Sequence, residues 1–313
     1  MINKTSKIFI AGHKGLVGSA ILRKLRYFGY KKILLVDKKK LNLIDQKEVI
    51  KFLKKEKPKF IFIAAAKVGG IYANDAYKAQ FIYENLQIQS NLIHGAYLAG
   101  VKDLIFLGSS CVYPKKCKQP IKEKYLLNGY LEKTNDAYAI AKIAGIKMCE
   151  SYNEQYGTNY KCLMPTNTFG PNDNYDTENS HFIPALIKKV YLISGKMNKK
   201  VKLWGNGLAK RELIYVDDIA DACYYFMNKK IKETVINIGT GKDTTIKNYL
   251  KIILKIAKIE KQTSIIYDHS KPNGTTRKVL DVSLAKKYGW IAKTNTVDAL
   301  KKTYHEFKQN NRY

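Results

Sequence analysis

The stretch KIFIAGHKGLVGSAIL, residues 7–22, decides the fold of this chain. A short apolar run leads into Gly12, Gly15 and Gly18, and an amphipathic run follows. In a strand–loop–helix unit the first glycine permits a tight turn, the second admits a pyrophosphate and the third lets the helix pack on the strand. The N–H groups at the helix N-terminus then attract phosphate. The stretch predicts a dinucleotide-binding loop, whose other cofactor-facing residues would be His13, Lys14, Leu16 and Val17.

Apolar runs and helical patterns alternate through the first half of the chain. Near-continuous apolar runs at residues 7–12, 31–37, 60–66 and 103–110 predict buried parallel strands. Between them, apolar residues spaced three and four apart predict helices over residues 15–29, 45–57 and 83–100. A further helix over 136–157 and a strand over 161–167 continue the series. This alternation predicts an α/β fold, a Rossmann doubly wound parallel sheet.

The pattern loosens after residue 168. Residues 171–181 are a polar loop by composition, and residues 201–218 have the pattern of a hairpin. We therefore expect residues 1–168 to form a Rossmann domain for NADP, with residues 213–241 returning to it. Residues 169–212 and 242–313 would form a smaller C-terminal α/β substrate lobe.

Composition excludes several classes of function. The net charge is +30, but only 5 of the 56 basic residues are arginine and no basic stripe is interleaved with aromatics, so no nucleic-acid partner is expected. The longest clean apolar run, residues 60–66, is far too short to cross a membrane. Five cysteines without metal-ligand spacing indicate reduced thiols, a cytoplasmic location and no metal site.

The end of the second predicted strand bears on the choice of cofactor. Asp37 can accept hydrogen bonds from an adenosine ribose, which favours NAD. Lys38 and Lys14 can hold a 2′-phosphate instead, which favours NADP. We expect NADP, since two lysines can converge on one phosphate while Asp37 points away.

Tyr138 and Lys142 are four residues apart and share one helix face. Beside a nicotinamide, the phenol can give its proton to a carbonyl oxygen, and the ammonium can lower the phenol's pKa and hold the ribose. Ser109, at the end of the fourth predicted strand, can hydrogen-bond the same oxygen. The glycine loop, Ser109 and the Tyr–Lys pair together predict carbonyl reduction.

In this order, those motifs resemble the extended short-chain dehydrogenase/reductases. Within them the chain resembles the GDP-L-fucose synthase family, through AGHKGLVGSAI, AAAKVGGI, GSSCVYP, YAIAKIAG, NSHFIPALI and RELIYVDD. The resemblance implies an NADPH-dependent enzyme that epimerises C3 and C5 of GDP-4-keto-6-deoxy-D-mannose and reduces C4. It also implies a homodimer built on two long helices, here residues 83–98 and 137–156.

The resemblance assigns the acid–base roles of the epimerisation to Cys111 and His181. A thiol and an imidazole both exchange protons near neutrality with modest tuning, so the assignment suits the chemistry. Taken separately, Cys111 could be an inert buried thiol. His181 could be a polar cap of the helix that follows it.

Further positions follow from the resemblance. At the cofactor it implies Leu107, Gly108, Ser110, Lys142, Pro165, Thr166, Asn167, Thr168 and His181. At the substrate it implies Asn167, Lys189, Trp204, Arg211 and Arg277. Phe169 departs from the family, which usually has a tyrosine there.

Two alternatives stay open. The protein could reduce C4 of another GDP-4-keto sugar, such as a 6-deoxy-heptose, with or without epimerisation. It could also be a non-catalytic Rossmann protein that senses a cofactor or binds nucleic acid, although such a protein would be expected to lose the Tyr–Lys pair.

Overall fold

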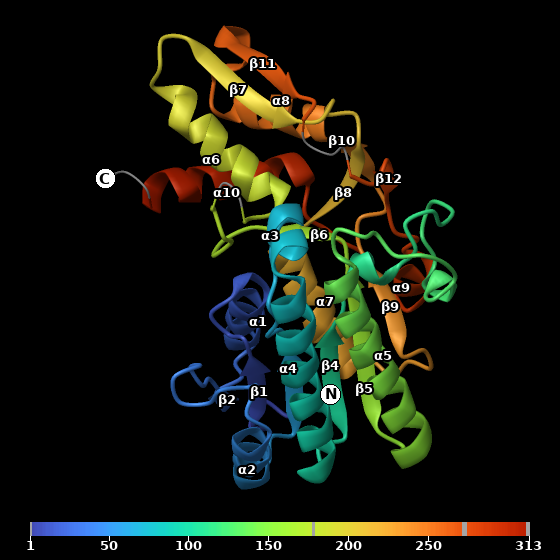
Figure 1. Ribbon diagram of the computed structural model, residues 1–313. Coiled ribbons are helices and arrows are strands. Elements are labelled where there is room, and N and C mark those ends of the chain that lie inside the picture. Colours follow the sequence, from blue (N-terminus) through green and yellow to red (C-terminus); the bar gives the residue numbers. More distant parts are fainter. Residues whose placement is uncertain (1, 177–178, 271–273, 311–313) are drawn as a thin grey trace.

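A computed structural model describes residues 2–176, 179–270 and 274–310 of the chain. Figure 1 shows a larger lobe built on a central sheet and a smaller lobe above it. Within the described residues the central sheet has six parallel strands in the order β2-β1-β3-β4-β5-β9. This confirms the predicted doubly wound α/β fold. The strands are β1 (Ile8–Ala11), β2 (Ile33–Leu34), β3 (Phe60–Ile63), β4 (Asp103–Leu107), β5 (Asn159–Pro165) and β9 (Val235–Ile238).

Helices cover both faces of this sheet because its strands are apolar on both sides. Ile8 and Ile10 of β1 pack in the cluster that includes α1 (Leu16–Tyr27) and α7 (Val216–Asn228). The alternate residues Phe9 and Ala11 pack in the opposite cluster. The helices on that second face are α2 (Gln46–Glu56), α4 (Lys78–Leu98) and α5 (Asp136–Tyr156).

The smaller lobe contains two further sheets. β7 (Lys199–Trp204) pairs in parallel with β11 (Thr263–Asp268). β8 (Lys210–Tyr215) pairs with β10 (Asp243–Thr245), β12 (Arg277–Lys278) and β6 (Asn167–Phe169). Its helices are α6 (Phe182–Ser194), α8 (Ile246–Ile256) and α10 (Thr296–Asn310). The remaining elements are α3 (Ile71–Ala76), α9 (Ser283–Lys287), η1 (Ser110–Val112), η2 (Glu123–Tyr125) and η3 (Glu260–Gln262).

The predicted hairpin over residues 201–218 is wrong. β7 and β8 do not pair with each other but with different partners. Gly205 and Gly207 between them have φ values of +65° and +70°, a region that glycine adopts readily. The chain can therefore turn there without closing a ladder. β7 pairs with a later strand, and β8 pairs with one earlier and two later strands.

Other boundaries differ modestly from expectation. β2 is shorter than residues 31–37, because the chain leaves the sheet and Val36 and Asp37 line a cavity instead. Of the segment 213–241, α7 and β9 lie in the larger lobe, whereas β8 joins the smaller one. The domain boundaries at residues 168, 212 and 241 stay predictions. None of the described helices has both the length and the apolar content needed to cross a membrane.

Candidate active site

The glycine loop is packed too tightly for side chains at two of its three glycines. Gly12 has φ +88°, and a Cβ atom there would lie 2.7 Å from the backbone nitrogen of Ala65. A Cβ atom on Gly18 would lie 2.1 Å from the carbonyl oxygen of Gly12. Gly15 is the N-cap of α1 and no side chain caps this helix, so its first N–H groups face the loop. The loop therefore fits a pyrophosphate at the helix N-terminus.

A cavity of about 450 Å³ opens beside this loop. That volume lies within the range of about 300–1,000 Å³ that small-molecule sites occupy. Its walls are largely apolar, from Phe9, Leu41 and Ile88 among others. The predicted cofactor residues on its wall are Gly12, His13, Lys14, Gly15, Asp37 and Lys38. Leu16, Val17 and Gly18 are in the first turn of α1, which begins at this wall.

Asp37 points toward the glycine loop, contrary to the expectation that it points away. Its Oδ1 lies 2.8 Å from Lys14 Nζ and 3.4 Å from His13 Nε2. The hydrogen bond from Lys14 is the largest influence on the carboxyl group and lowers its pKa. Asp37 and Lys14 therefore stand together where an adenosine ribose would bind in such a fold.

The reduction residues gather at the carboxyl end of β4. Ser109 follows this strand after Gly108, and its hydroxyl lies close enough to the phenol of Tyr138 to lower the pKa of that phenol. Lys142 is buried one turn further along α5 and donates to the carbonyl oxygen of Leu107 at 2.8 Å. Its Nζ lies 5.8 Å from the centre of the Tyr138 ring. The structure thus brings Ser109, Tyr138 and Lys142 together, as the spacing predicted.

The expected lowering of the phenol's pKa is not found. Burial raises the pKa of Tyr138, the nearby Cys111 raises it further, and the hydrogen bond from Ser109 only partly offsets this. Burial also lowers the pKa of Lys142 to about 7. Because the ammonium is turned toward the Leu107 carbonyl, its charge contributes little at the phenol oxygen.

Cys111 is the middle residue of η1, and two hydrogen-bond donors lie near its sulfur. The Asn135 amide Nδ2 lies 3.4 Å from Sγ, and Lys278 Nζ lies 3.5 Å from it. Its own backbone N–H donates to Ser109 Oγ at 3.2 Å. Burial alone would raise the pKa of this thiol, but Lys278, Ser109 and Arg211 outweigh burial and lower it. The thiol is therefore suited to proton exchange near neutrality.

His181 is the N-cap residue of α6, but its side chain does not cap the helix. The residue is exposed at the surface, yet protein packs closely enough around the imidazole to desolvate it. This desolvation is the larger cause that lowers the pKa of His181, and the positive charge of Lys278 is the smaller one. A lowered pKa makes the imidazolium a stronger acid, so the protonated ring gives up its proton readily, which suits an acid–base role.

Sequence reasoning missed Lys278 and Asn135. Lys278 lies in β12 directly beside Arg211 of β8, so the two side chains point to the same side of the sheet. The preceding residue, Arg277, points to the other side and is ion-paired with Asp243 at 2.7 Å. The alternation of side chains along a strand could have shown that only one member of the Arg-Lys pair reaches the thiol.

Comparison with known proteins agrees with this arrangement. The model of the NAD dependent epimerase/dehydratase family matches residues 8–239. The chain belongs to this family. It is 46% identical over 310 residues to the putative GDP-L-fucose synthase 2 of Arabidopsis thaliana, covering 99% of this chain and 94% of that one. It is 45% identical over 313 residues to the GDP-L-fucose synthase of Escherichia coli strain K12, covering 97% of each.

A solved structure is similar over nearly the whole chain. The GDP-mannoheptose C4 reductase of Campylobacter jejuni, with NADP bound, has a TM-score of 0.89 and 38% sequence identity to this chain. The similarity covers 98% of this chain and 100% of that one. The resemblance to GDP-L-fucose synthases within the epimerase/dehydratase family is thereby confirmed.

In this family member, residues 165–168 lie where the two lobes meet. Asn167 Nδ2 donates to the carbonyl oxygen of Glu212 at 2.8 Å, and Thr166 Oγ1 donates to the same oxygen at 3.3 Å. Pro165 ends β5 and Thr168 lies in β6. Leu107, Gly108 and Ser110 lie at the adjacent end of β4, where a Cβ atom on Gly108 would lie 2.4 Å from Met164 Sδ. The two strand ends therefore lie close together beneath the candidate site.

The predicted nucleotide-binding residues form two separate groups. Lys189 Nζ lies 5.4 Å from the centre of the Trp204 ring and donates to the Lys202 carbonyl oxygen. Arg211 is instead close to Cys111 and donates to the Thr275 carbonyl oxygen at 2.5 Å. Phe169 is buried against Tyr215, so the family's usual tyrosine is replaced here by a packed ring.

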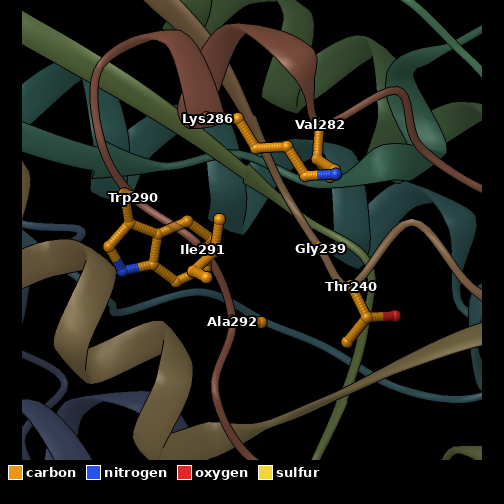
Figure 2. A pocket seen from close by; sticks show the side chains of 7 residues that line it. All are labelled: Gly239, Thr240, Val282, Lys286, Trp290, Ile291 and Ala292. Carbon is orange, nitrogen blue, oxygen red and sulfur yellow. The ribbon is translucent and has the colours of Figure 1, made fainter.

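A second cavity, of about 180 Å³, lies beyond the end of β9 (Figure 2). Its wall includes Thr240, Lys286 and Trp290, and none of the predicted site residues. It is smaller than the sites that hold ligands of nucleotide size. Within residues 2–176, 179–270 and 274–310, no cluster of three or more His, Cys, Asp or Glu side chains could hold a metal ion.

Proposed function

We propose that this protein converts GDP-4-keto-6-deoxy-D-mannose to GDP-L-fucose, by epimerising C3 and C5 and reducing C4 with NADPH. One observation carries the proposal. The thiol of Cys111 stands beside Ser109 and Tyr138, so an acid–base group shares one site with the residues for carbonyl reduction. Reduction of C4 alone does not require such a thiol. The 45–46% identity to curated GDP-L-fucose synthases supports the same function.

NADPH fits the larger lobe. The glycine loop lets the pyrophosphate of the cofactor come close to the backbone. The adjoining cavity has Lys14 and Lys38 on its wall, where they can bind a 2′-phosphate. The C. jejuni reductase at 38% identity was solved with NADP bound. When bound, NADPH supplies the hydride that reduces C4. We place the sugar nucleotide between this lobe and the smaller one, near Lys189 and Arg211.

Epimerisation uses the acidity of the carbons on either side of the C4 ketone. Cys111, as thiolate, takes the proton from C3 or C5, which leaves an enolate with its charge on O4. The hydroxyls of Tyr138 and Ser109 hydrogen-bond O4 and stabilise that charge. His181 returns a proton from the opposite face, which inverts the carbon. Each inversion leaves Cys111 as a thiol and His181 as a neutral imidazole. Proton exchange with water then restores the thiolate and the imidazolium.

Reduction uses the same oxygen. Tyr138 gives its phenolic proton to O4 as C4 becomes an alcohol carbon. The resulting phenolate is stabilised by the Ser109 hydroxyl, which lies close enough to the phenol to lower its pKa. Protonation from solvent then restores the phenol. Because one pair of hydroxyls serves the enolates and the alkoxide, all three steps can occur without the sugar leaving the site.

The test is a reaction in D₂O with NADPH and product identification by NMR. We expect deuterium at both C3 and C5 of GDP-L-fucose. A reduced product without deuterium at either carbon would contradict the epimerase function. The matched variant Cys111→Ser should lose deuterium incorporation more than it loses reduction of an already epimerised ketone.

A second candidate function is reduction of C4 in a related GDP-4-keto sugar. The similarity to the GDP-mannoheptose C4 reductase favours it. The presence of both Cys111 and His181 argues for epimerisation in addition. Comparing kcat/KM for the 6-deoxyhexose and for a heptose analogue would separate the two.

We also propose that the protein is a homodimer that works in the cytoplasm. Its five cysteines are free, as expected in a reducing compartment. The outer faces of α4 and α5 expose apolar side chains, among them Tyr83 at 58% and Ile140 at 47%. Two copies could bury these faces in a bundle of four helices. Sedimentation analysis of Ile140→Glu would test this, since a dimer through these helices should dissociate.

A further inference from the structure

The positive charge beside the thiol of Cys111 comes from a residue with no assigned role. Lys278 lies 167 residues further along the chain, yet its Nζ is 3.5 Å from Sγ. A lysine at this distance from sulfur stabilises the thiolate by direct charge attraction and by a charge-assisted hydrogen bond. The contact is therefore more than packing, because it acts on the protonation state of the sulfur.

Lys278 is held in place by strand pairing. β12 pairs in parallel with β8 so that Lys278 is opposite Arg211, and the two cations share one side of the sheet. Arg211 is occupied by the carbonyl oxygens of Lys210 and Thr275. The cation that contacts the sulfur is thus Lys278, while Arg211 adds a more distant positive charge.

The other charged and titratable groups around Cys111 do not cancel this charge. Tyr138 is a neutral phenol whose pKa is raised. Glu132, the carboxylate near Arg211, is ion-paired with Lys115 at 3.0 Å. Asn135 contributes a neutral donor to the sulfur from the N-cap position of α5. The balance of charge facing the sulfur is therefore positive.

We propose that Lys278 is a positioning residue that sets the protonation of the acid–base pair, because it holds its positive charge 3.5 Å from the sulfur of Cys111. The same charge also acts on His181. The charge favours the thiolate over the thiol and the neutral imidazole over the imidazolium. Both effects lower the pKa of the group concerned. Removal of the charge should raise both pKa values together. A merely structural lysine would not produce this joint shift.

The test measures both groups in the ligand-free protein. In a Cys117→Ser background, which removes the other partly exposed thiol, the rate of Cys111 alkylation by iodoacetamide is followed against pH. His181 is followed by NMR with labelled histidine and assigned with His181→Gln. We expect both midpoints to rise in Lys278→Met and to return in Lys278→Arg. The control is Lys210→Met, from the opposite side of the same ladder, in which both midpoints should stay unchanged.

An unchanged Cys111 midpoint in folded Lys278→Met overturns the inference, as does an equal rise in Lys210→Met. Circular dichroism and NADPH binding establish that the variants are folded. If Lys278→Met does not fold, Lys278→Gln keeps a hydrogen-bond donor without the charge and gives the same comparison.

The inference rests on the proposed function in one respect only, which is the effect of Lys278 on catalysis. At pH 7, deuterium exchange into the keto sugar without NADPH should fall about tenfold in Lys278→Met, and its optimum should move to higher pH. Shifted midpoints with no exchange in the unmodified protein would sink the epimerase function and leave the inference standing. Deuterium exchange in the unmodified protein, together with unshifted midpoints in Lys278→Met, would overturn the inference and leave the epimerase function standing.

Discussion

Lys14 Nζ lies 2.8 Å from Asp37 Oδ1, so the residue that follows His13 in the glycine loop is tied to the acid beyond β2. The same ammonium is the group available for a 2′-phosphate. Asp37 therefore competes with the phosphate for Lys14 and also repels its negative charge.

Asp37→Asn should lower KM for NADPH several-fold, because Lys14 is released and the repulsion is removed. KM for NADH should rise, since the amide is a weaker acceptor for a ribose hydroxyl. Steady-state kinetics with both cofactors measure this. Glu56→Gln is the matched control, because it breaks an ion pair with Lys7 at the opposite end of β1. An unchanged preference between the cofactors in Asp37→Asn would contradict the prediction.

Lys142 should make the stability of the ligand-free protein depend on pH. Burial lowers its pKa to about 7, well below the ordinary lysine value. Between pH 7 and that ordinary value, the unfolded chain binds a proton at this residue and the folded protein does not, so stability rises with pH. From pH 7 to 9 the free energy of unfolding should rise by about 2 kcal/mol relative to Lys142→Met.

Urea unfolding at the two pH values measures this difference. Lys147 is an exposed lysine of the same helix, so in Lys147→Met the free energy of unfolding should change with pH as it does in the unmodified protein. Parallel pH profiles for the unmodified protein and Lys142→Met would show that the folded protein keeps Lys142 charged.

Gly70 should be required for the position of His181. A Cβ atom on Gly70 would lie 2.3 Å from the Ser180 carbonyl oxygen, and the Gly70 N–H donates to the Asn179 carbonyl oxygen at 2.7 Å. Gly70→Ala should therefore displace the segment that leads into His181. We expect deuterium exchange at C3 and C5 to fall at least about tenfold, because acid–base catalysis depends on the position of the group.

The fluorescence of bound NADPH should change little in Gly70→Ala, since the glycine loop is elsewhere. Gly195→Ala is the control, as a Cβ atom there meets nothing within 4 Å. Equal exchange rates in Gly70→Ala and Gly195→Ala would disprove the dependence on Gly70.

Glu212 should be a major contributor to stability. It is fully buried, and its Oε1 accepts the N–H groups of Thr240 and Gly241 at 2.6 and 2.7 Å. Its Oε2 accepts the N–H of Leu280 at 2.7 Å. In Glu212→Gln the amide NH₂ must face one of these donors, which costs about 1–3 kcal/mol or more in free energy of unfolding. Urea titration should show this loss and none for the exposed Glu154→Gln.

Much of the larger lobe could be predicted from the sequence because its signals are local. The glycine loop, the apolar strands and the Tyr138–Lys142 spacing each lie within a short window, and the structure brings them together as expected. The partners of β7 and β8 could not be predicted, because their pairing depends on strands 31 or more residues away in the chain. Lys278 was missed for the same reason. The orientation of Asp37 and the raised pKa of Tyr138 depend on burial and neighbouring charges that no spacing encodes.

The pairing of β12 with β8 also has a consequence for synthesis of the chain. The glycine loop, Cys111 and Tyr138 emerge from the ribosome long before Lys278, and domains generally fold as they emerge. Until β12 takes its place, the sulfur has no adjacent ammonium and is an ordinary thiol, slow to react with oxidants. The sulfur thus gains its adjacent ammonium only once the chain is nearly complete, and an incomplete product carries a less reactive thiol.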